Sequence, residues 1–119
     1  MNLEQASQLT HAQWQEMAEE LKKTAETRLF IGGAFVDAID GGTFDNISPV
    51  DGSLINRCAA GKEADINKAV EIAKASFKSG EWSRRAPRER MEVMYRWADL
   101  IAENGAELSL MDTIDMGKP

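Results

Sequence analysis

The chain has 119 residues, of which 43% are hydrophobic and 29% are charged, and its formal net charge is −6. This composition excludes an intrinsically disordered chain, and the negative charge argues against a nucleic-acid partner, which needs a basic surface. No apolar run is long enough for a membrane-spanning helix, and the N-terminus has neither a secretory nor a mitochondrial targeting pattern, so we expect a cytoplasmic protein without a membrane partner.

Residues 1–27 predict a helical N-terminal extension. Its apolar residues recur at three- and four-residue spacing, as on one face of a helix, and polar residues fill the other face. The stripe is formed by Trp14, Met17, Ala18, Leu21 and Ala25. Because it is narrow, we expect the extension to bind a neighbouring surface only weakly, or to fray.

The following residues predict a small antiparallel β-layer. Two short β-favouring runs flank Gly32-Gly33, and a Gly-Gly pair suits the positive φ angles of a two-residue hairpin. Two further strands are expected over 43–47 and 53–60, separated by the turn residues 49–52.

From residue 63 the hydrophobic period changes from two to 3.6, which predicts three helices. The first runs to a C-terminal Gly80, the second begins at Pro87 and ends near residue 103, and the third covers about 106–116. Asp65 stands where a helix N-cap or first-turn acid is favoured. The β-layer is too small to cover three helices, so we expect much of their apolar surface to face partners outside these residues.

The sequence contains few candidates for chemistry. His11, the single histidine, is expected to be an exposed helix residue, and one histidine with one cysteine cannot form a structural zinc site. Cys58 lies in a strand pattern without a nearby base, so a small core residue is favoured over a nucleophile. Residues 84–90 contain four arginines, for which a solvated loop and first helical turn is favoured over a phosphate or protein docking patch.

Several segments, taken in order, resemble the N-terminal portion of an NAD(P)-dependent aldehyde dehydrogenase. They are LFIGGAFVDA, FDNISPVDGSLI, DINKAVEIAKASFKSGEW and the long segment from PRERMEVMYRWADLIAENGAELSL to MDTIDMGKP. The resemblance covers residues 28–119 and departs from the family pattern at Ser48, where the family usually has asparagine. It is nearest to the enzymes for amino- and betaine-type aldehydes, including γ-glutamylaminobutyraldehyde.

The resemblance implies an α/β fold class, with a β-hairpin layer and three helices that belong to an incomplete Rossmann-like cofactor-binding domain. It also implies oxidation of an aldehyde to the carboxylic acid through a cysteine thioester, with NAD or NADP as cofactor, by a homodimer or homotetramer. The family's catalytic motifs are not among these residues, so we assign no catalytic and no cofactor-binding residue. We expect the chain to be a truncated, inactive part of such an enzyme, with residues 1–27 as an extension outside the matched domain.

One family site is implied at the level of residues. Many members bind a monovalent cation through main-chain oxygens of a strand and a carboxylate at a helix end, and the matching positions here are Asn46, Ile47 and Asp115. A hard cation prefers such oxygen ligands. The alternative for Asp115 is a carboxylate that accepts hydrogen bonds from local amides.

Two other functions were weighed against this one. A free-standing protein-interaction module without catalytic activity would use the surplus apolar helix surface. A small acidic enzyme that uses Cys58 would need a base that the sequence does not place nearby. A coding sequence that continues past Pro119 to a Gly-Gln-x-Cys motif would favour the dehydrogenase, and a stop codon there would favour the module.

Overall fold

The computed structural model describes residues 1–118, which form five helices and two β-hairpins. The helices are α1 (Leu3–Ala6), α2 (His11–Thr24), α3 (Glu63–Ser79), α4 (Pro87–Glu103) and α5 (Gly105–Met116). The strands are β1 (Leu29–Ile31), β2 (Ala34–Val36), β3 (Thr43–Ile47) and β4 (Leu54–Ala59). The mixed helix and strand content confirms the expected fold class.

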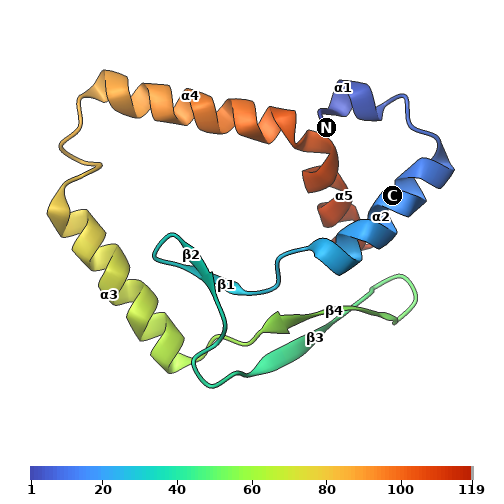
Figure 1. Ribbon diagram of the computed structural model, residues 1–119, viewed down its shortest axis with the longest axis horizontal. Helices are drawn as coiled ribbons and strands as arrows, with labels where there is room; N and C mark the ends of the chain where they lie inside the picture. Colours follow the sequence, from blue (N-terminus) through green and yellow to red (C-terminus); the bar gives the residue numbers. More distant parts are fainter. Residues whose placement is uncertain (119) are drawn as a thin grey trace.

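The elements form an open, flat frame (Figure 1). Helices α3 and α4 make two of its sides, α5 with α2 makes a third, and the two hairpins lie toward the remaining side. The principal extents are 49 × 39 × 19 Å. The radius of gyration is 17.9 Å, whereas a compact domain of this length would have about 13.5 Å.

The β-layer consists of two separate antiparallel hairpins. In the first, Phe30 pairs with Phe35 across the turn, and Gly32 and Gly33 have φ angles of +66° and +81°. These angles are those that the Gly-Gly pair predicted, because residues with a Cβ avoid them. The second hairpin pairs β3 with β4, close to the predicted strand bounds.

The N-terminal residues form two helices instead of the single extension expected from the sequence. Each begins with a capping box, Asn2 with Gln5 and Thr10 with Gln13. These boxes satisfy orphan amides at both helix starts and thereby favour a break between residues 6 and 11. The predicted apolar stripe of α2 is only partly exposed, and α2 contacts α5 and β4.

The three long helices begin and end as predicted. Gly80 ends α3 with a φ of +73°, Pro87 is the first residue of α4, and Gly117 ends α5 with a φ of +64°. A glycine in the left-handed conformation commonly ends a helix, and a proline is common in the first turn of a helix.

Very little apolar surface is buried. The buried apolar residues are Ala6, Ala38, Ala106 and Leu110, while large apolar side chains such as Phe77 and Trp97 are more than half exposed. The accessible surface is 9042 Å², compared with about 6,400 Å² for a compact chain of this mass. This confirms the expected surplus of apolar helix surface. No helix among the described residues has the length and apolarity needed to cross a bilayer.

Candidate functional site

Helix α2, helix α5 and the β3–β4 hairpin enclose a small cavity. Its volume is about 90 Å³. The lining residues come from three places in the sequence: Lys22, Ala25, Glu26, Asn46, Ile55, Asn56, Cys58, Met111, Ile114 and Asp115. Two of the three residues implied as cation ligands, Asn46 and Asp115, therefore lie in one cavity.

The side chains of Asn46 and Asp115 are directly bonded. The Asn46 side-chain amide donates to Asp115 Oδ1 at 3.1 Å and to Asn56 Oδ1 at 3.4 Å. Asn46 and Asn56 face each other across the β3–β4 ladder, so their pairing follows from the strand register. The bond to Asp115 spans 69 residues and joins the end of α5 to β3.

Ile47 follows at an irregularity of the ladder. Asn46 pairs with Asn56 and Ile47 pairs with Leu54, so Ile55 is the extra residue of a β-bulge. A bulge interrupts the regular hydrogen-bond ladder and leaves main-chain groups unpaired in it. Ile47 is 50% exposed. Because its side chain has no polar atom, only its main-chain oxygen could bind a cation.

The donor set at this place fits a hard cation in its chemistry. A carboxylate, two side-chain amide oxygens and main-chain oxygens near a bulge are all oxygen ligands, which sodium and potassium ions prefer. Asp115 Oδ1 already accepts a hydrogen bond from the Asn46 side-chain amide, so a cation would compete for this oxygen or use Oδ2. Among residues 1–118 no group of three or more histidine, cysteine or acidic side chains is placed to hold a metal ion.

Asp65 is a structural centre whose full role the sequence did not reveal. Its side chain is 3% exposed, and its carboxylate accepts the main-chain amides of Lys62 and Ile39, each at 2.9 Å. These two bonds lower the pKa of the Asp65 carboxyl below its usual value. The bond to Lys62 is the expected helix cap, but the bond to Ile39 depends on how the chain returns from β2.

The other candidate catalytic residues, His11 and Cys58, lie where no catalytic partner is evident in the described part of the chain. His11 is exposed at the start of α2, as expected. Cys58 is only partly buried, contrary to the expected core position, and it lines the cavity between α2, α5 and the β3–β4 hairpin. Its thiol donates to Asn56 Oδ1 at 3.5 Å. No histidine lines its cavity, so the geometry adds nothing in favour of a nucleophile.

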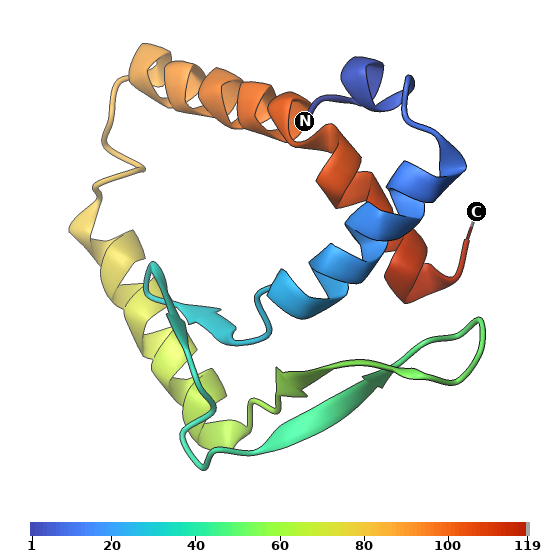
Figure 2. The ribbon, with the colours of Figure 1, turned by 45° about the vertical axis from the view of Figure 1, so that its right-hand side comes forward.

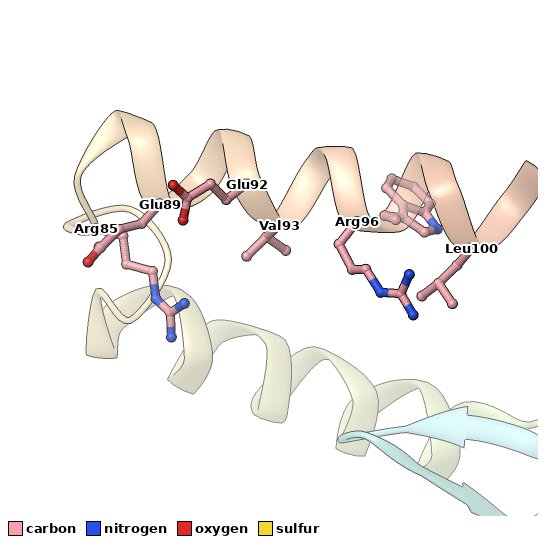
Figure 3. Close-up of a pocket in the computed structure, with 7 residues that line it drawn as sticks. Arg85, Glu89, Glu92, Val93, Arg96 and Leu100 are labelled. Atoms are coloured by element: carbon pink, nitrogen blue, oxygen red, sulfur yellow. The ribbon is translucent and has the colours of Figure 1, made fainter.

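The arginine-rich segment lies beside a hollow of about 800 Å³ along α4 (Figure 3). Arg85 donates to the Glu81 carbonyl at 2.9 Å, and Arg88 lies 3.3 Å from Glu92. Val93, Arg96 and Leu100 project from the same side of α4. Arginines that pair with neighbouring acids and a mixed charged and apolar lining agree with a solvated helix face more than with a phosphate site.

Comparison with known proteins gives a consistent family. The model of the "Aldehyde dehydrogenase family" matches residues 35–119. The NADP/NAD-dependent aldehyde dehydrogenase PuuC of Escherichia coli (strain K12) is 38% identical over 108 residues, which are 91% of this chain and 21% of the relative.

Solved structures agree at the level of the fold. An apo indole-3-acetaldehyde dehydrogenase superposes with a TM-score of 0.87 and 48% identity, covering 93% of this chain and 25% of that one. A γ-glutamyl-γ-aminobutyraldehyde dehydrogenase from Burkholderia cenocepacia gives a TM-score of 0.84 and 45% identity, covering 89% of this chain and 21% of that one. The chain spans 10% to 21% of the length of the curated relatives that it matches.

Proposed function

Because this chain belongs to the aldehyde dehydrogenase family, we propose that it serves an enzyme that oxidises an aldehyde to the carboxylic acid with NAD or NADP. The observation that carries the proposal is the agreement of sequence over residues 35–119, together with a fold match that covers 93% of the chain. The substrate class is an aldehyde, and the relatives named for γ-glutamyl-γ-aminobutyraldehyde and indole-3-acetaldehyde favour one with an amino- or indole-bearing chain.

The part that these residues take in the reaction is that of a scaffold. Residues 28–119 supply the outer hairpins and helices of the cofactor-binding domain, and residues 1–27 lie outside it as an N-terminal extension. The exposed apolar faces of α3 and α4 give this role physical support, since such faces need cover from further protein. Neither Cys58 nor His11 is assigned a catalytic role.

The cavity between α2, α5 and the β3–β4 hairpin is proposed to hold a monovalent cation. Asp115 would supply its carboxylate, and Asn46 and Ile47 would supply main-chain oxygens at the bulge. The ion would neutralise the Asp115 charge and would fix the end of α5 to β3. No residue of this cavity is proposed to bind the cofactor.

A chimera tests the scaffold role. Residues 28–119 replace the aligned segment of the Escherichia coli relative, and the chimera is assayed for aldehyde-dependent formation of NADH and NADPH. We expect a folded chimera with activity within about tenfold of the parent, since scaffold changes act on the rate through positioning. A folded chimera that has lost all activity would oppose the proposal. The same assay on the protein expressed from its own gene, with a panel of aldehydes, tests the activity and the substrate class.

The protein-interaction module is the second candidate, and the exposed apolar area also supports it. The scaffold and the interaction module differ in the protein that covers the exposed apolar helix faces. A scaffold face packs within one dehydrogenase subunit, whereas a module face binds a separate protein. We propose the scaffold, in a homodimer or homotetramer, and sedimentation of the protein from its own gene measures that state.

A further inference from the structure

We propose that residues 1–24 form an N-terminal clasp, a positioning segment that holds α5 against the β3–β4 hairpin and so keeps Asp115 beside Asn46. The clasp comprises α1, α2 and the turn between them. It goes beyond the proposed dehydrogenase activity and does not depend on it, because it concerns how α5 is held.

The start of α5 has no side-chain cap of its own. The Asn104 side-chain amide donates backward to the Leu100 carbonyl at 2.8 Å, and no side-chain bond caps the helix. Instead, the main-chain carbonyl of Met1 accepts the N–H of Ala106 at 3.2 Å. Since the first amides of a helix lack partners within the helix, this bond satisfies one of them from the clasp.

Small residues let α1 approach α5 closely. Ala6 of α1 is 1% exposed and Ala106 of α5 is fully buried, whereas α3 and α4 are almost entirely exposed. A Cβ added at Gly105 would lie 3.0 Å from Leu3 Cγ and 3.5 Å from its Cδ1. Leu3 therefore lies directly on the first residue of α5, where a side chain larger than that of glycine would require Leu3 to shift.

The second helix of the clasp continues along α5 to the cavity. The Thr10–Gln13 capping box starts α2 directly after the turn, and α2 then crosses α5 and reaches β4 (Figure 2). Its C-terminal end supplies Lys22 to the cavity that Asn46 and Asp115 also line. The clasp thus contacts the first residues of α5 through Met1 and Leu3. Near the last residues of α5, the C-terminal end of α2 lies between α5 and the hairpin.

Without the clasp, α5 would have few contacts with the hairpin among the described residues. They include the Asn46–Asp115 bond, the approach of Gly117 to Pro49, and Met111 and Ile114, which line the same cavity as β4. A single hydrogen bond between partly exposed groups contributes on the order of 1 kcal/mol, which is too little to fix a helix. The clasp therefore determines whether Asp115 stays beside Asn46.

Hydrogen exchange on the intact protein tests this, with peptides that cover residues 43–47 and 105–116. Gly105→Val places a branched side chain against Leu3, and we expect amide exchange to rise by about tenfold in both peptides, although residues 43–47 are remote from the substitution. Adding Leu3→Ala restores room, so the double variant should recover at least part of the protection. Glu4→Ala, an exposed change on α1, is the control and should leave both peptides unchanged.

Three results would overturn the proposal. The first is faster exchange confined to residues near 105, without an effect in 43–47. The second is a Gly105→Val effect that Leu3→Ala does not relieve, because valine would then act only through its helix propensity. The third comes from deletion of residues 1–24, which needs no new side chain: unchanged exchange in both peptides would mean that α5 is held by other contacts.

Discussion

The carboxylate of Asp65 accepts the main-chain N–H of Ile39 at 2.9 Å, a bond that joins the exit of the first hairpin to the start of α3 across 26 residues. The other oxygen accepts the N–H of Lys62 at 2.9 Å, so one buried side chain satisfies two main-chain donors. Buried amides without a partner are costly, and Asp65 removes that cost at both places.

Asp65→Asn should weaken this junction. An asparagine offers one oxygen and one NH₂ group, so one of the two amides would face a donor. We expect exchange of the Ile39 and Lys62 amides to accelerate by roughly tenfold, together with a lower melting temperature. Glu63→Gln, which makes the same charge change two residues away in the first turn of α3 without loss of a side-chain hydrogen bond, is the control. Equal exchange in both variants would show that Asp65 is dispensable.

Asn46→Leu should uncouple the hairpin from α5. It removes the amide that donates to Asp115, and we expect the free energy of unfolding to fall by about 1 kcal/mol. A double-mutant cycle with Asp115→Ala isolates the pair, and the coupling energy should be about 0.5–1.5 kcal/mol by denaturant unfolding. Strictly additive effects of the two substitutions would mean that the bond contributes nothing to stability.

Asp51 predicts a defined acid transition of the β3–β4 turn. Hydrogen bonds from the Ser53 amide and hydroxyl, and from the Ser48 hydroxyl, lower the pKa of the Asp51 carboxyl to about 2. A pKa lowered by folding stabilises the folded state above the ordinary pKa of about 4, and this stabilisation is lost as the pH falls from about 4 to 2. The stability difference between the wild-type protein and Asp51→Asn should therefore be largest above pH 4 and vanish near pH 2. Asp112→Asn controls for net charge, and a difference independent of pH would contradict the assignment.

Two glycines separate backbone strain from steric contact. Gly33 and Gly117 both have left-handed φ angles, +81° and +64°, but only Gly117 has a near neighbour, with Pro49 Cγ 2.8 Å from an added Cβ. Gly33→Ala should cost about 1 kcal/mol from its φ angle alone. Gly117→Ala should cost about 1–3 kcal/mol more, because Pro49 is rigid and must shift. Thermal unfolding of both variants measures the difference, and equal costs would mean that Pro49 moves aside freely.

A polypeptide of residues 1–119 alone should associate. Large apolar side chains of α3 and α4 are exposed, among them Phe77 at 78% and Trp97 at 58%. Exposed apolar patches of this extent drive association and bind hydrophobic dyes. Sedimentation should show a mean mass that rises with concentration, together with broad NMR lines. A monomer with sharp, dispersed spectra would contradict this.

Local patterns predicted the elements well because each depends on neighbouring residues. The Gly32-Gly33 pair requires its turn, Gly80 ends α3 and Pro87 begins α4, and each effect arises within a few residues of the chain. The helical extension expected over residues 1–27 consists of two helices, because the Thr10–Gln13 capping box starts a new helix at His11. That signal, a threonine followed three residues later by glutamine, was present in the sequence.

The candidate site could be predicted from the sequence only in part. Asn46, Ile47 and Asp115 were implied by a resemblance, and no pattern within the chain relates residue 46 to residue 115. The bond from Asp65 to Ile39 and the contact of Leu3 with Gly105 were not foreseen, since both join segments that are remote in sequence.

The sequence by itself determined where the strands and the helices α3, α4 and α5 begin and end, to within about one residue, and that these helices carry more apolar surface than the hairpins cover. Capping, turn conformation and hydrophobic period are short-range effects, so they can be read locally. Only the tertiary structure decided that α5 rests on the N-terminal helices and that Asp115 meets Asn46, because these contacts depend on the path of the whole chain between them.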